Sequence, residues 1–147
     1  MTGLRRKARV LALQVLYEID SCNHKTEEVL TRTIRESSLP ELATGFTSKL
    51  VKGIVQNKQA IDDGIRRFAP LFPLEQIAII DRNILRLAVY EILFDGDVPV
   101  KAAVNEAVEL AKAFGGDGSP KFINGVLGSV IANSDDLLTA SRKNKNL

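Results

Sequence analysis

Two short groups of residues carry side chains suited to binding phosphates and bases. The first ten residues contain four cations and no acid: Arg5, Arg6, Lys7 and Arg9. The second group is Ser119-Pro120-Lys121-Phe122, which indicates a helix start with a cation and an aromatic ring in its first turn. Cations neutralise phosphates, helix N-termini offer N–H groups, and exposed rings stack on unpaired bases. Together the two groups predict a site for single-stranded nucleic acid.

Each group also has a simpler interpretation. Phe122 stands four residues before Val126, so its ring fits equally well in a helix core. The basic N-terminus fits a solvated arm. Periodicity alone does not bring the two groups together, and the nucleic-acid interpretation requires that the N-terminal cations and Phe122 converge on one ligand.

Catalytic motifs are missing from the sequence. The single His24 and single Cys22 leave no zinc ligand set, no internal disulfide and no catalytic triad. Residues 115–122, GGDGSPKF, lack the Gly-Lys-Ser/Thr ending of a phosphate loop. The neighbouring acids Asp62-Asp63 and Asp135-Asp136 are expected to be solvated rather than paired in a cleft. We therefore expect no enzymatic activity, no metal and no cofactor.

Composition indicates a globular chain with an uneven charge distribution. Its 147 residues are 45% hydrophobic and 26% charged, with a net charge of +2. All 18 acids lie between residues 11 and 140, where they outnumber the basic residues, whereas both ends are basic. This pattern favours a local anion site. No apolar run is long enough for a membrane span, and Gln14 and Glu18 interrupt the signal-peptide pattern. We expect a cytoplasmic protein, although an amphipathic targeting peptide stays open as an alternative.

Helical periodicity without strand-like alternation predicts an all-α fold. The expected elements are a helix over 4–20, a peripheral helix over 26–36, a helix from Pro40 whose apolar stripe reaches Ile65, a short helix or turn over 74–80, a buried helix over 81–94, and helices starting at Pro99 and Ser119. Asp81 and Ser119 are the expected N-caps of their helices. The interior charges of the buried helix, Arg86 and Glu91, must reach its rim or find partners.

The domain organisation follows from the prolines. Pro70 and Pro73 are expected to divide a single domain, residues 1–134, into helical halves over about 4–69 and 74–134. The residues 135–147 are polar and basic, which predicts a flexible tail.

The stretch from Ile80 to Val130 closely resembles the NusB family of bacterial transcription antitermination factors. Its most specific parts are Asp97-Val98-Pro99, Asn105-Glu106-Ala107 and the run from Lys121 to Leu127. The resemblance extends over roughly Arg5 to Ile131. It also includes the N-terminal RRKARVLALQVLY and mid-chain positions such as Phe46, Leu50, Val51, Gly53, Asn57, Ile61 and Asp62.

This resemblance implies an all-α fold of two small helical subdomains packed into one compact domain. It also implies binding of boxA-type single-stranded RNA from ribosomal RNA leader transcripts, together with the ribosomal protein NusE, in an antitermination complex on RNA polymerase. By position, the RNA-contacting residues are Arg5, Arg6, Lys7, Arg9, Ser119, Lys121 and Phe122. The implied NusE-facing residues are Tyr17, Glu75 and Asp81. Gly118 stands where the family often has an acid, so we expect RNA binding to be kept or strengthened.

Two other hypotheses stay open. NusB-like domains also occur in ribosomal RNA cytosine methyltransferases, but these need a separate Rossmann-like catalytic domain, for which 147 residues leave no room. The chain is also consistent with a homodimeric helical bundle that acts through protein contacts. Light scattering with and without RNA distinguishes this possibility from an RNA-binding protein.

Overall fold

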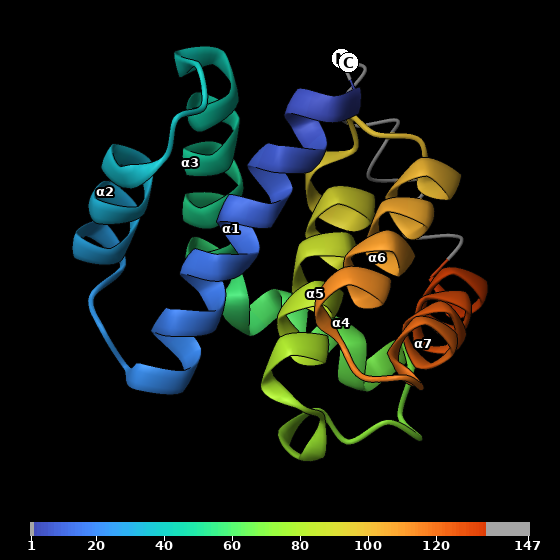
Figure 1. The fold of residues 1–147 in the computed structure, drawn as a ribbon. Coiled ribbons are helices and arrows are strands. Elements are labelled where there is room, and N and C mark those ends of the chain that lie inside the picture. Colours follow the sequence, from blue (N-terminus) through green and yellow to red (C-terminus); the bar gives the residue numbers. More distant parts are fainter. Residues whose placement is uncertain (1, 135–147) are drawn as a thin grey trace, which may run out of the picture. The chain divides into compact units, whose positions relative to one another are not determined.

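The computed structural model describes residues 2–134, and every element in that range is helical (Figure 1). This confirms the predicted fold class. The chain forms two compact units, Met1–Asn57 and Lys58–Leu147, called unit 1 and unit 2 below. The predicted tail over 135–147 lies outside the described residues.

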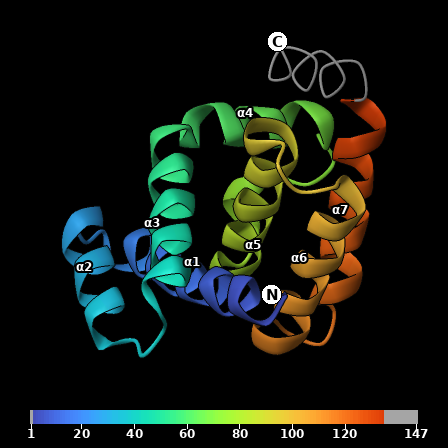
Figure 2. The same ribbon diagram turned by 90° about the horizontal axis from the view of Figure 1, so that it is seen from above.

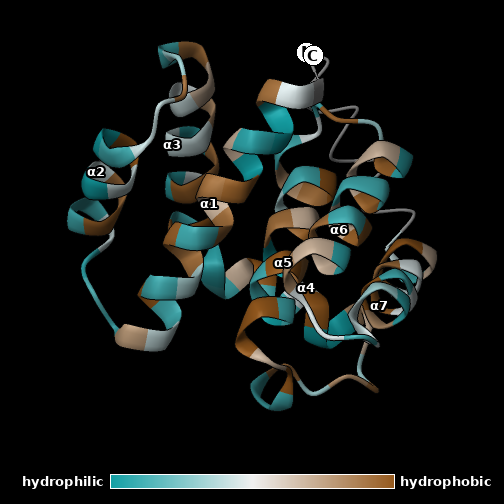
Figure 3. Ribbon diagram, viewed as in Figure 1, coloured by the Kyte–Doolittle hydropathy of each residue, from teal (hydrophilic) through white to brown (hydrophobic). Residues whose placement is uncertain are grey.

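Unit 1 consists of three helices: α1 (Thr2–Cys22), α2 (Thr26–Glu36) and α3 (Glu41–Gln56). Each helix contacts the other two. Hydrophobic and hydrophilic residues recur along α1, as expected for a helix with one apolar side that packs against its neighbours (Figure 3). Ala8 and Ala12 are fully buried, and the small residues let α3 approach closely enough for the Thr47 hydroxyl to donate to the Ala8 carbonyl at 2.9 Å. This hydrogen bond fixes the position of α3 along α1.

Unit 2 is built around α5 (Ile79–Val89), which contacts α4 (Lys58–Phe68), α6 (Val100–Phe114) and α7 (Ser119–Asn133). Figure 2 shows α6 and α7 side by side next to α5. A 3-10 turn, η1 (Leu74–Gln76), precedes α5, and a π-helical segment, η2 (Tyr90–Asp95), continues it. Every residue from Asn83 to Val89 is buried. The predicted central buried helix is therefore confirmed.

The buried charge on α5 has the partner that the sequence requires. Arg86 donates from Nε and Nη2 to the two carboxylate oxygens of Asp62 on α4, at 2.9 and 3.1 Å. Both side chains are almost completely buried. The prediction that Asp62 is solvated is thus wrong, because its carboxylate balances the guanidinium of α5.

The predicted helix from Pro40 to the region of Ile65 is two helices. α3 ends at Gln56 and α4 begins at Lys58, and the units divide at the same place, before Pro70 and Pro73. At the break, the Asn57 backbone N–H and side-chain amide both donate to the Gly53 carbonyl, at 3.0 and 2.7 Å. Asn57 thereby satisfies the end of α3 and stops the helix. The apolar repeat continues across this break, which is why periodicity alone does not reveal it.

The N-caps of α5 and α7 are not the residues that the sequence predicts. α5 begins at Ile79, so Asp81 lies in its first turn, and Gly118 rather than Ser119 occupies the N-cap position of α7. Neither N-cap residue makes a side-chain capping bond. The Ser119 hydroxyl instead bonds to other parts of unit 2, as described below.

Within residues 2–134, none of the helices is long and apolar enough to cross a membrane.

Candidate nucleic-acid interface

The N-terminal cations lie on the first turns of α1. Arg5, Arg6 and Lys7 are exposed, whereas Arg9 is only 5% exposed. Cations in the first turns of a helix oppose its dipole, so their position costs stability and favours an anionic ligand. Because Arg9 is buried, three of the four N-terminal cations are accessible to phosphates.

Phe46 on α3 organises two of these cations. The guanidinium carbon of Arg5 lies 4.5 Å from the centre of its ring, and that of Arg9 lies 5.4 Å away. Both distances are in the range of cation–π interactions, which stabilise a guanidinium on an aromatic face. The sequence places Phe46 in the apolar stripe of its helix and among the positions that resemble the NusB family, and neither assigns it a contact with the cations. Its contact with residues about 40 positions earlier in the chain gives no signal in local periodicity.

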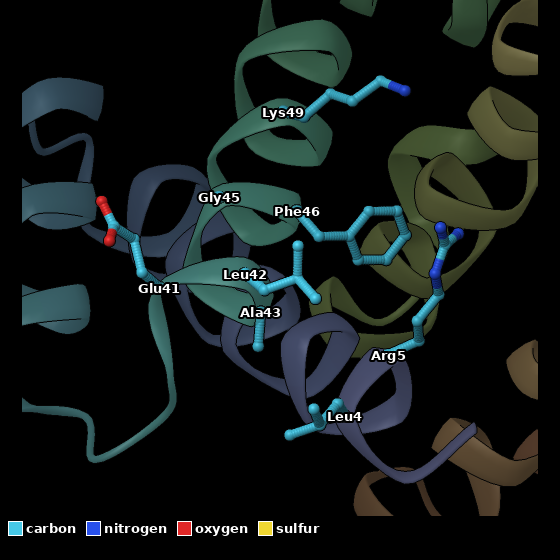
Figure 4. Close-up of a pocket in the computed structure, with 8 residues that line it drawn as sticks. All are labelled: Leu4, Arg5, Glu41, Leu42, Ala43, Gly45, Phe46 and Lys49. Carbon is cyan, nitrogen blue, oxygen red and sulfur yellow. The ribbon is translucent and has the colours of Figure 1, made fainter. Parts of the chain in front are cut away.

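An open hollow of about 670 Å³ lies beside Phe46. Figure 4 shows the eight residues that line it, with Leu4 and Arg5 contributed by α1. The others are Glu41, Leu42, Ala43, Gly45, Phe46 and Lys49, all on α3. The Arg5 guanidinium lies beside the Phe46 ring, and the Glu41 carboxylate points away from it (Figure 4).

In unit 2, Ser119 is a buried junction between the start of α7 and the start of α5. Its hydroxyl accepts from the Gly116 N–H at 2.9 Å and donates to Asp81 Oδ2 at 3.0 Å. A Cβ at Gly115 would lie 2.5 Å from Ser119 Cβ, so only glycine permits this close approach. Ser119 therefore positions the loop before α7, and its hydroxyl is engaged within the protein.

Phe122 is half-buried in the first turn of α7 and packs edge-to-face on Phe72, with ring centres 5.6 Å apart. The ring and Asp81 line the same open hollow, together with Phe72, Pro73, Gln76, Ile77 and Ala78. Lys121, the preceding residue, is exposed. Phe122 thus combines the two interpretations left open by the sequence, since one part of the ring packs on Phe72 and another borders a surface hollow.

The three predicted partner-facing residues are all at least partly accessible. Tyr17 on α1 is 43% exposed. Glu75 is exposed and pairs with Arg66, which donates to it from Nε at 3.0 Å. Its own backbone N–H, and then Arg66, lower the pKa of Glu75, so this carboxylate is ionised at neutral pH. Asp81 is half-buried, and its Oδ1 atom is enclosed without a hydrogen-bond partner in the described residues.

The structure brings Ser119, Asp81 and Phe122 together in unit 2, so one predicted partner-facing residue borders two predicted RNA-contacting residues. The N-terminal cations belong to unit 1. Their convergence with Phe122 on one ligand stays a prediction. Among residues 2–134, no group of three His, Cys, Asp or Glu side chains is arranged to hold a metal ion.

Comparisons with known proteins agree on one family. The sequence pattern of the NusB family matches residues 6–132. A transcription antitermination protein NusB of Dehalococcoides mccartyi is 52% identical over 130 residues, which cover 88% of this chain and 91% of that protein.

Solved structures give the same result. Thermotoga maritima NusB is 32% identical, with a TM-score of 0.79 over 87% of this chain and 90% of that one. A crystal structure of the antitermination factors NusB and NusE in complex with dsRNA contains a chain 27% identical to this one. Its TM-score is 0.82 over 90% of this chain and 98% of that one. On the sequence match over residues 6–132 and the 52% identity to a curated relative, this chain belongs to the NusB family.

Proposed function

We propose that this protein is a non-enzymatic, RNA-binding transcription antitermination factor. It binds boxA-type single-stranded RNA of ribosomal RNA leader transcripts together with NusE, and this pair helps RNA polymerase resist termination. The binding takes place on nascent transcripts, which assigns the protein to the bacterial cytoplasm. The observation that carries the proposal is the set of three exposed cations on the first turns of α1, in a chain of the NusB family.

The charge distribution supports RNA as the ligand. Arg5, Arg6 and Lys7 lie within ten residues that contain no acid, so this part of the chain is strongly basic. In unit 2, Lys121 and Phe122 place a cation and a partly accessible ring next to each other at the start of α7. A cation for phosphate and a ring for an unpaired base are the two components of single-strand binding.

The NusE-facing surface is proposed to include Tyr17, Glu75 and Asp81. Glu75 offers an ionised carboxylate at an exposed position, and Asp81 borders the same surface hollow as Phe122. A relative has been crystallised in complex with NusE and dsRNA, which supports NusE as the partner.

The test is a titration of boxA-type RNA by fluorescence anisotropy, with and without NusE, over a range of salt concentrations. Four exposed cations, Arg5, Arg6, Lys7 and Lys121, predict a slope of log K against log salt of about −3. The triple variant Arg5→Gln, Arg6→Gln, Lys7→Gln should flatten the slope by about 2 units and weaken binding about 100-fold at 0.1 M salt.

A matched triple variant controls for net charge. Lys25→Gln, Lys52→Gln and Lys58→Gln remove the same three charges from exposed positions outside the candidate interface. This variant should keep nearly all of the affinity. Equal loss in both triple variants would show that bulk charge rather than the start of α1 binds RNA. A duplex of the same sequence, used as competitor, should bind more weakly than the single strand.

A further inference from the structure

The hollow beside Phe46 has a mixed lining that the proposed function does not yet use. Leu4, Leu42 and Phe46 make much of its surface apolar, while Arg5 and Lys49 stand at its edge (Figure 4). Its volume of about 670 Å³ is within the range of ligand sites, about 300–1,000 Å³.

Leu42 is the clearest sign that this surface has a ligand. It is 74% exposed, although it begins an α3 face whose next turns are buried at Leu50 and Ile54. Leu42 therefore gives little to the core. A large apolar side chain beside cations in a hollow matches a ligand that has a flat apolar face and a negative charge.

Arg5 can bind the negative charge of such a ligand while it stays in contact with the Phe46 ring. A guanidinium group that stacks face-on with a ring keeps its N–H donors in its own plane, pointing away from the ring. Arg5 lies 4.5 Å from the ring centre and is exposed, so in such an arrangement its N–H donors can reach a phosphate while the contact with Phe46 persists. Phe46 thus reduces the freedom that Arg5 loses when it binds an anion.

We propose that this hollow is a subsite for one unpaired nucleotide of the bound RNA. The base lies against Leu42 and Phe46, and its phosphate pairs with Arg5. The inference rests on the proposed RNA binding and adds a base-contacting subsite in unit 1, distinct from Phe122 in unit 2.

Charge favours a nucleotide over an apolar protein segment as the occupant. Arg5 in the lining and Lys7 nearby on α1 are exposed, and the one acid of the printed lining, Glu41, points away from the Phe46 ring. An apolar peptide offers no anion to Arg5, whereas each nucleotide of RNA carries one phosphate for each base.

The test compares two ligands of equal length on the full chain: a boxA-type RNA oligonucleotide and an abasic-spacer strand with the same number of phosphates. Leu42→Ala should weaken binding of the RNA about fivefold and leave binding of the abasic strand unchanged. Its salt slope should not change, because no phosphate contact is lost. Arg5→Gln should weaken both ligands and flatten the slope by about 0.7.

Leu71→Ala is the matched control, since Leu71 is 87% exposed in unit 2 and outside the hollow. It should bind both ligands as the unmodified chain does.

The Phe46 ring is tested by two further variants. Phe46→Tyr should keep the RNA affinity, and Phe46→Leu should lower it about tenfold. Thermal melts show whether each variant is folded.

The outcomes separate this inference from the proposed function. If the unmodified chain binds RNA with the expected salt slope but Leu42→Ala has no effect, the subsite is wrong and RNA binding stands. Equal losses on both ligands, an equal loss in Leu71→Ala, or a changed oligomeric state of Leu42→Ala would also overturn the subsite. A chain that binds no RNA contradicts the proposed function itself.

Discussion

The two units handle their polar side chains differently. In unit 1, Glu18 on α1 pairs with Arg32 on α2 where both are partly accessible to water, and the Phe46 ring on α3 holds the exposed Arg5 as well as the buried Arg9. In unit 2, Arg66 and Glu75 pair at the surface, but two further polar links between helices are buried. Arg86 pairs with Asp62 between α5 and α4, and the Ser119 hydroxyl bonds to Asp81 between α7 and α5.

This difference separates stability from binding. A buried polar pair in unit 2 holds the helices in one arrangement, and breaking it leaves an unsatisfied group in the interior. A surface charge in unit 1 contributes little to folding and stays accessible to a ligand. Substitutions of polar residues should therefore affect mainly stability in unit 2 and mainly RNA affinity at the start of α1.

The largest effect is expected for Arg86→Met. This change leaves the Asp62 carboxylate buried without its guanidinium partner, which typically costs about 3–5 kcal/mol of unfolding free energy. Urea denaturation measures the loss. The double variant Asp62→Leu, Arg86→Met should recover much of it, because no uncompensated charge remains.

Arg32→Met in unit 1 provides the comparison, since it breaks an ion pair between side chains that are partly accessible to water. Its loss of stability should be much smaller than that of Arg86→Met. Equal losses in the two variants would remove the distinction between the units.

A smaller effect is expected for Gly115→Ala. The new methyl group would lie 2.5 Å from Ser119 Cβ and 2.9 Å from the Ala111 carbonyl oxygen, so α6 and α7 must separate. Overpacking of this kind costs about 1–3 kcal/mol. Gly118→Ala is the control, because nothing lies within 4 Å of its new methyl group. A melting temperature of Gly115→Ala equal to that of Gly118→Ala would show that the contact between Gly115 and Ser119 accommodates a methyl group without cost.

The sequence predicts the helices well, because apolar spacing records which side of each helix is buried. It also predicts that Arg86 needs a partner. It does not identify that partner, since Asp62 is 24 positions away and looks solvated beside Asp63. The role of Phe46 is missed for the same reason: its contacts with Arg5 and Arg9 join two helices far apart in the chain. Periodicity reports the environment of a residue, whereas contacts between helices depend on how the helices pack.

The candidate site shows the same limit. The sequence singles out Arg5, Arg6 and Lys7, because cations without neighbouring acids stand out in composition, and all three are exposed. It gives Arg9 the same weight, although that side chain is buried, and it treats Ser119 as a cap of its own helix. Both features depend on packing against another helix.

Ser119→Ala should have an effect of about 1–2 kcal/mol on unfolding free energy, because it removes one acceptor from the Gly116 N–H and one donor from Asp81. Urea denaturation measures this change, and Ser129→Ala, a half-buried serine on the same helix, is the control. If Ser119 instead donates directly to RNA, Ser119→Ala will lower RNA affinity while stability stays unchanged. That result would mean that polar side chains at the start of α7 contribute to RNA affinity rather than to stability, as expected for the start of α1.

The smallest effect is expected for the stabilisation that the Glu18–Arg32 ion pair of unit 1 loses at acid pH. Hydrogen bonds from Arg32, and then from His24 at 2.8 Å, lower the pKa of Glu18 from 4.5 to about 2. A carboxyl whose pKa is lower in the folded state stabilises the fold above its unfolded pKa and loses that contribution as pH falls toward the folded pKa. The advantage of the unmodified chain over Glu18→Gln should therefore be constant near neutral pH and shrink between pH 4.5 and about 2.

Thermal melts of both proteins across that range measure this advantage, and Glu28→Gln, at an exposed position of α2, controls for the loss of a carboxylate. Since Glu18 and Arg32 are partly accessible to water, high salt should reduce the advantage at every pH. An advantage as large as that of the Asp62–Arg86 pair, or one that persists unchanged at pH 2, would mean that unit 1 depends on its surface charges for folding. In that case the exposed cations of α1 could not be interpreted as reserved for a ligand.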